Sequence, residues 1–90
     1  MIIVLSAMQA WAVDFYGKIT YRDGSKCGSC RLAFEHSGFK DTYADSSGNY
    51  SISMSGGSPM CVNVYHNGSM VLSNVCANSS RMRLDVTVKK

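Results

Sequence analysis

The sequence predicts an all-β fold: a seven-stranded antiparallel β-sandwich with Greek-key connections, stabilised by disulfides. Three observations predict it. Apolar and polar residues alternate with a period of two in short runs along most of the chain, which is typical of strands with one buried face. Turn-forming residues separate these runs, and no helical periodicity is sustained. Four cysteines among 90 residues suit a domain too small to be held firmly by its core alone.

The clearest element is a hairpin whose second strand covers residues 50–54. The first strand of this hairpin ends at Asp45, a serine-rich turn follows, and the second strand alternates apolar residues with serines. An aspartate can accept hydrogen bonds from the amides of its own turn, and a glycine adopts the positive φ that other residues resist. We therefore expect Asp45 and Gly48 to be turn-forming residues.

The other strands follow from the same alternation. They are expected at residues 15–21, 30–36, 39–44, 60–66, 69–76 and 82–89. Between two of these runs lies Asn67-Gly68, a strong hairpin signal because both residues tolerate the positive φ of a type I′ turn. The inward positions of the strands should form the core: Phe15, Ile19, Leu32, Phe34, Tyr50, Ile52, Val62, Val64, Val71, Leu84, Val86 and Val88.

The N-terminus has the features of a secretory signal peptide. Residues 1–12 carry no charge, are mostly apolar and end in the small-x-small pattern Ala10-Trp11-Ala12, which signal peptidase accepts. The run is too short to span a bilayer. We expect cleavage after Ala12, which leaves a single domain at residues 13–90 in a secreted or periplasmic protein without a transmembrane segment. The alternative is an apolar N-terminal strand or helix that stays in the fold.

The cysteines fit export, because disulfides persist outside the cytosol. Cys61 and Cys76 flank the predicted Asn-Gly hairpin and should approach each other, so we favour the pairs Cys61–Cys76 and Cys27–Cys30. Four cysteines permit three connectivities. A cross-link from Cys30 to either cysteine of the later hairpin therefore remains open.

Three segments show a pattern known from one family of β-sandwiches. Residues 16–20 (YGKIT), 28–32 (GSCRL) and 42–50 (TYADSSGNY) resemble the opening strand, the start of the second strand and the T-D-x-x-G-x-Y/F turn of carboxypeptidase regulatory-like domains, also called transthyretin-like or prealbumin-like domains. The chain departs from the family pattern in its four cysteines. The resemblance implies a β-sandwich that serves as a non-catalytic accessory or binding module.

One short motif is typical of reactive sites, the Cys-x-x-Cys at Cys27 and Cys30. Such a motif exchanges disulfides when it stands at a helix N-terminus. Here it precedes a predicted strand and no helix is predicted, so we expect a structural disulfide. A zinc site made of all four cysteines is disfavoured, because Cys61 and Cys76 lack close ligand spacing. We therefore expect no metal and no cofactor.

No catalytic constellation is visible elsewhere. His36 and His66 stand at strand ends with no acidic or cysteine partner placed by the sequence, and the serines lack a nucleophile-elbow motif. The net charge of +3 is modest and the basic residues are scattered, whereas nucleic-acid binding requires a denser basic stripe. We expect neither an enzyme nor a nucleic-acid-binding protein.

The aromatic residues are the remaining candidates for a binding site. Tyr16, Phe39, Tyr43 and Tyr65 could expose rings for contact with a glycan or a peptide, although cross-strand pairing explains aromatic residues in strands equally well. Our first hypothesis is an exported non-enzymatic module that binds a protein or a glycan through loops or an edge strand. The alternatives are a thiol–disulfide protein that uses Cys27 and Cys30, and a small secreted effector or inhibitor of a foreign enzyme.

Overall fold

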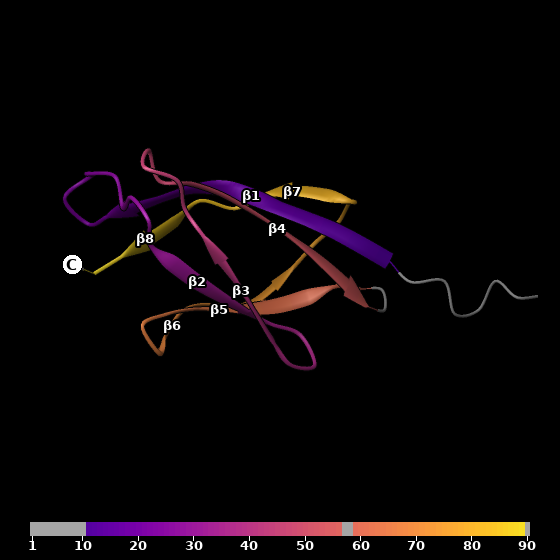
Figure 1. Cartoon of the computed structure of the whole chain (residues 1–90). Helices are drawn as coiled ribbons and strands as arrows, with labels where there is room; N and C mark the ends of the chain where they lie inside the picture. Colours follow the sequence, from indigo (N-terminus) through magenta and orange to yellow (C-terminus); the bar gives the residue numbers. More distant parts are fainter. Residues whose placement is uncertain (1–10, 57–58, 90) are drawn as a thin grey trace, which may run out of the picture.

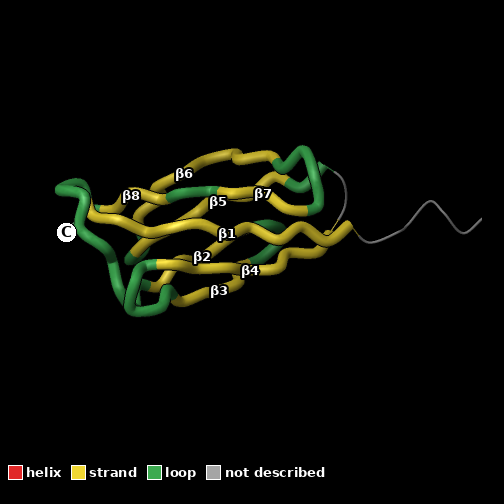
Figure 2. The backbone as a smooth tube through the Cα atoms, turned by 90° about the horizontal axis from the view of Figure 1, so that it is seen from above, coloured by secondary structure: helices red, strands yellow, loops and turns green. Residues whose placement is uncertain are grey.

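The computed structural model describes residues 11–56 and 59–89, and these residues form two packed β-sheets (Figures 1 and 2). The described residues contain no helix, and therefore none that could cross a membrane. The all-β prediction is confirmed. The eight strands of the described part are β1 (Trp11–Tyr21), β2 (Arg31–Glu35), β3 (Phe39–Tyr43), β4 (Asn49–Gly56), β5 (Cys61–His66), β6 (Ser69–Cys76), β7 (Arg81–Arg83) and β8 (Val86–Val88).

The first sheet is organised around β1, its longest strand. β4 lies antiparallel along one edge of β1, with Val13 opposite Met54 and Phe15 opposite Ile52. β7 and β8 lie along the other edge, and both run parallel to β1. The sheet is therefore mixed, not antiparallel as predicted.

The predicted C-terminal strand 82–89 is interrupted, which gives eight strands in the described residues instead of seven. Its two parts keep the same register against β1 on either side of the break. At the break, the backbone amide of Lys18 donates to Oδ1 of Asp85 at 2.9 Å, where a regular ladder would provide a backbone carbonyl. The side chain of Asp85 thus replaces one backbone partner, and the strand resumes after it.

The second sheet is antiparallel in the order β3-β2-β5-β6. The Asn67-Gly68 turn joins β5 to β6, and its φ values of 51° and 80° agree with the predicted type I′ turn. Irregular register between β5 and β6 marks β-bulges in this hairpin. Such bulges increase the local twist and make the outer strand a poorer template for pairing.

The core lies between the sheets, where the inward residues of both sheets meet. Ten of the twelve predicted core residues are buried, while Val71 and Leu84 are only partly buried against them. Rings stack across the interface, with the centroids of Phe15 and Phe34 5.6 Å apart. The buried hydrophobic residues that the sequence analysis did not place in the core are Val13, Cys27, Ala44, Met54, Met60 and Ala77.

Two disulfides join Cys27 to Cys30 and Cys61 to Cys76, the pairing favoured from the sequence. Cys61 and Cys76 face each other across β5 and β6. By constraining the unfolded chain, a link across a loop of this size contributes about 3 kcal/mol to stability.

The predicted signal peptide falls largely outside the described residues. Of its twelve residues, Trp11 and Ala12 are described, and they begin β1 opposite Gly56 and Ser55. The prediction of cleavage after Ala12 therefore stays a prediction.

Candidate functional site

One outer face of the molecule carries three of the four candidate aromatic residues. In the β3–β2–β5 part of the second sheet, Tyr43 lies opposite Arg31, Phe39 lies opposite Glu35, and Tyr65 lies opposite Ala33. Residues directly opposite each other in a sheet share one face, and the alternate residues Leu32 and Phe34 of β2 are buried. These aromatic side chains therefore lie on the outer side of the sheet, which we call the aromatic face.

Phe39 and Tyr65 form the centre of the aromatic face. Their ring centroids are 5.4 Å apart with the planes at 60°, and Phe39 remains 64% exposed. Oε1 of Glu35 accepts hydrogen bonds of 3.1 Å from both the hydroxyl of Tyr65 and Nδ2 of Asn63. Partial desolvation, together with the hydrogen bond to Glu35, raises the pKa of Tyr65. The hydrogen bond to Glu35 thus orients the hydroxyl of Tyr65.

A shallow pocket of about 280 Å³ lies beside this pair. Its size is close to the lower end of the range of small-molecule sites, about 300–1,000 Å³. It combines apolar surface with a guanidinium and an amide, since its lining residues are Arg31, Ala33, Phe39, Tyr65, Asn67 and Gly68. Asn67 and Gly68, predicted only as turn residues, therefore also border the pocket.

Tyr43 and Asp41 extend the aromatic face along β3. Tyr43 is 64% exposed. The carboxylate of Asp41 lies 4.0 Å from the guanidinium of Arg31, and both side chains are well exposed. A pair in such surroundings contributes little to stability, so both groups are available to a ligand at small energetic cost.

The fourth candidate, Tyr16, lies apart from this face on the first sheet. The guanidinium of Arg81 covers its ring at 4.4 Å from the centroid. Tyr16 lines a larger hollow of about 520 Å³ between β3 and the first sheet.

Polar groups in this hollow largely satisfy one another. Nζ of Lys40 and Oγ1 of Thr42 donate to the backbone carbonyls of Ser53 and Ser51, each at 2.7 Å. The hydroxyl of Ser53 donates to Asp14. The hollow is therefore the seam where β3 covers the edge of β4, and it is a weaker candidate than the aromatic face.

Asp45 forms the turn that the sequence predicts. Its Oδ1 accepts from the amides of Ser47 at 2.8 Å and Asn49 at 3.0 Å, and the hydrogen bond from Asn49 is the main reason that the pKa of Asp45 lies below its ordinary value. Gly48 has a φ of 82° and packs against the carbonyl of Ile19. These residues position the strands and lie outside the aromatic face.

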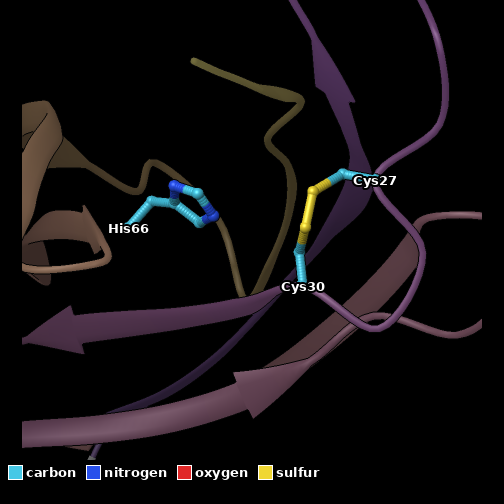
Figure 3. A group of neighbouring side chains, drawn as sticks. All are labelled: Cys27, Cys30 and His66. Carbon is cyan, nitrogen blue, oxygen red and sulfur yellow. A yellow bond between two sulfur atoms is a disulfide. The ribbon is translucent and has the colours of Figure 1, made fainter. Parts of the chain in front are cut away.

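A second cluster of chemical interest surrounds the Cys27–Cys30 disulfide (Figure 3). The imidazole of His66 points toward the disulfide, and the two sulfurs and a ring nitrogen all lie within 4.8 Å of one another. Cys27 is fully buried, whereas Cys30 and His66 are half-buried. The hydroxyl of Tyr21 lies 3.8 Å from Sγ of Cys30. The cluster therefore opens to solvent on the side of Cys30 and His66.

The sequence analysis missed the partnership between His66 and the disulfide, although a signal for it exists. His66 continues the inward alternation of Val62 and Val64 along β5. β5 runs antiparallel to β2, with Val64 opposite Phe34. The end of β5 at His66 therefore lies near the start of β2, which Cys30 directly precedes. Only the pairing of two strands distant in sequence brings Cys30 and His66 together.

The comparisons with known proteins support the architecture. No protein-family model matches the sequence, and no characterised protein matches it by sequence. By structure, the chain is similar to chlorocatechol 1,2-dioxygenase from Pseudomonas putida, with a TM-score of 0.63, 10% identity, and coverage of 90% of this chain and 61% of that chain. It is also similar to a DUF3823 family protein from Parabacteroides merdae, with a TM-score of 0.62, 13% identity, and coverage of 90% and 47%.

The chain thus spans about half to three-fifths of these solved chains. At such low identity, the likeness shows a shared β-sandwich-like fold and carries no activity across, since one fold serves many functions.

Proposed function

We propose that this protein is an exported, non-enzymatic binding module that holds a glycan on its aromatic face. The observation that carries the proposal is the contact between the exposed ring of Phe39 and the half-buried ring of Tyr65, beside a pocket lined by Arg31 and Asn67. Large exposed apolar side chains that gather on one face mark interaction sites more often than single ones do. Phe39, Tyr43 and Met70 are the large hydrophobic residues that stand out as exposed among the described residues.

The chemistry of the face favours a sugar over a flat protein partner. A pyranose presents apolar C–H faces and a rim of hydroxyls, and it therefore suits an aromatic platform with polar groups placed at its border. Phe39 and Tyr65 provide the platform. Arg31 and Asn67 provide donors at the border of the pocket. The carboxylate of Asp41, 4.0 Å from the guanidinium of Arg31, provides an acceptor next to it.

Binding through an added edge strand, the other mode considered from the sequence, has less support. Side chains of β3 occupy the outer carbonyls of β4, β7 and β8 are three residues long each, and β6 carries bulges. These features disfavour strand addition at β4, β6, β7 and β8. The side-chain surface of the sheet is the better candidate.

Export and family membership belong to the same proposal. Two disulfides in the described chain are compatible with a compartment outside the cytosol. Membership of the carboxypeptidase regulatory-like, transthyretin-like class is supported by the two-sheet architecture and by the places of the matching segments. In the first segment, Gly17 lies close against the backbone of Leu84. In the third segment, Asp45 and Gly48 form a tight turn.

The experiment is a screen of the full chain against an array of mono- and oligosaccharides, followed by titration of the hits. Phe39→Ala should weaken binding about tenfold or more, because a central ring at a binding site contributes of the order of 1–2 kcal/mol. Tyr16→Ala is the matched control: it removes an aromatic ring from the other sheet and should leave affinity unchanged. If no sugar binds, or if Phe39→Ala binds as tightly as the unmodified chain, the proposal is wrong.

A further inference from the structure

The cluster of Cys27, Cys30 and His66 has the ligand types of a metal site. Within the described part of the chain, the imidazole of His66 makes no hydrogen bond. The other histidine, His36, is also half-buried, but its Nδ1 lies 3.0 Å from the carbonyl oxygen of Cys61 and its orientation is thereby fixed. His66 instead faces two sulfurs (Figure 3).

From this arrangement we propose that reduction of the Cys27–Cys30 disulfide creates a zinc site with two thiolates and the imidazole of His66 as ligands. In a tetrahedral zinc site the ligand atoms lie roughly 3.5–3.8 Å apart, given bond lengths of about 2.3 Å to sulfur and 2.0 Å to nitrogen. The atoms of the cluster already lie within 4.8 Å of one another. Reduction frees the two sulfurs to separate to the required distance, and a small rotation of His66 brings its nitrogen into place.

The surroundings complete such a site. The fourth position would be open to water on the solvent side, between Cys30 and His66, which are half-buried. The hydroxyl of Tyr21, 3.8 Å from Sγ of Cys30, can donate to a thiolate, and hydrogen bonds of this kind orient ligands and tune a metal site. The burial of Cys27 protects the second thiolate from solvent.

An external dithiol serves as the reductant of the Cys27–Cys30 disulfide. The dithiol is oxidised to its own disulfide, the sulfur–sulfur bond between Cys27 and Cys30 breaks, and each cysteine gains one electron and one proton. Zinc then displaces both thiol protons into solvent. With the disulfide closed, neither sulfur is a thiolate and no site exists. Binding is therefore controlled by the redox state of the chain.

The test uses the full chain in its oxidised form and after treatment with dithiothreitol, which is then removed anaerobically. Cobalt(II) serves as the spectroscopic probe and zinc is measured by competition with a chromophoric chelator. The reduced chain should bind one metal per chain and show thiolate-to-cobalt charge transfer with tetrahedral d–d bands, and the oxidised chain should show neither. After the same reduction, a Cys61→Ala, Cys76→Ala chain, checked for folding by circular dichroism, should bind metal as the reduced unmodified chain does, because Cys27 and Cys30 are retained.

The variants separate the three-ligand site from adventitious thiolate binding. His66→Ala should weaken zinc binding by at least about tenfold, because loss of a ligand should cost no less than loss of a group that only hydrogen-bonds a ligand, about 10–100-fold. The matched variant His36→Ala should not weaken binding. If His66→Ala misfolds, the ring nitrogens of both histidines are followed by NMR in the unmodified reduced chain, where zinc should shift His66 and leave His36 in place. Equal binding by the oxidised chain, no binding by the reduced chain, or zinc binding without an effect at His66 would each overturn the proposal.

Discussion

Among the glycines that the structure describes, Gly17 has the least room for a side chain. A Cβ at this position would lie inside contact distance of the backbone carbonyl of Leu84 and within 2.7 Å of Oδ1 of Asp85. Both atoms are held at the β7–β8 break, because the amide of Leu84 donates to the carbonyl of Tyr16 and Asp85 accepts from Lys18. Relief of the clash would therefore require the β7–β8 segment to move away from β1.

Gly17→Ala should destabilise the fold by about 2–3 kcal/mol, the upper part of the range for overpacking. The measurement is the free energy of unfolding from urea denaturation. Lys18→Ala is the matched control, since it truncates an exposed side chain at the next position and keeps the backbone hydrogen bond to Asp85, and it should change stability by less than about 0.5 kcal/mol. If Gly17→Ala is as stable as the unmodified chain, the β7–β8 segment moves away from β1 at little cost in free energy and the prediction is wrong.

Asp45 and Asp85 make stability depend on pH in the acid range. The amide of Asn49 holds the pKa of Asp45 below its ordinary value, and the amide of Lys18 does the same for Asp85, with a smaller contribution from Arg83. Each pKa is lower in the folded than in the unfolded chain. The stabilisation is therefore complete above the unfolded pKa, about 4, and is lost as the pH falls through the folded pKa values.

Urea midpoints measured between about pH 6 and pH 2 should fall as the pH drops below about 4. A chain with Asp45→Asn and Asp85→Asn keeps oxygen acceptors at both places but cannot titrate there, so its midpoint should fall less over the same interval. An equally steep fall in that variant would place the acid sensitivity in other groups.

At the scale of elements, the exposed edge of β4 is protected by two side chains of β3. Lys40 and Thr42 bind the carbonyls of Ser53 and Ser51, which otherwise would be open acceptors for a strand from another molecule. Lys40 and Thr42 alternate along β3 with the residues that point to the aromatic face. The same short strand therefore contributes to the aromatic face and protects the edge of β4.

Removal of both donors with Lys40→Ala and Thr42→Val should expose this edge and promote self-association. The expected result in sedimentation velocity is a concentration-dependent shift from monomer toward larger species. Lys26→Ala, which removes an exposed lysine away from this edge, is the control and should sediment like the unmodified chain. If the double variant stays at the sedimentation coefficient of the unmodified chain, the edge is protected by other means.

The elements were largely predictable from the sequence, because period-two alternation depends only on local pattern. β2, β3, β5 and β6 lie within one residue of their predicted bounds, and the positive φ values at Asn67, Gly68 and Gly48 follow from the turn chemistry. The parallel pairing of β7 and β8 with β1 could not be predicted, since alternation gives a strand its face and not its neighbour or its direction.

At the scale of the whole molecule, both candidate sites depend on pairings across the fold. Phe39 and Tyr65 meet because β2 lies between β3 and β5, and His66 meets Cys30 because β5 returns beside the start of β2. The sequence named Phe39, Tyr43, Tyr65 and Tyr16 as candidates without placing them relative to one another. The structure gathers the first three on the aromatic face and locates Tyr16 on the first sheet, with its ring under Arg81. Which side chains meet on one face is decided by the order of strands in each sheet, and the alternation pattern of the sequence does not give that order.

The central claim is that the aromatic face is the surface that binds a ligand, and NMR mapping tests it most directly. A ¹⁵N-labelled full chain is titrated with a sugar retained on the array, and the amide shifts are followed residue by residue. We predict shifts confined to residues 31–43 and 63–68, with β1, β4 and β7 unchanged. Shifts centred on the hollow at Tyr16 and Arg81, or spread evenly over both sheets, would contradict the account.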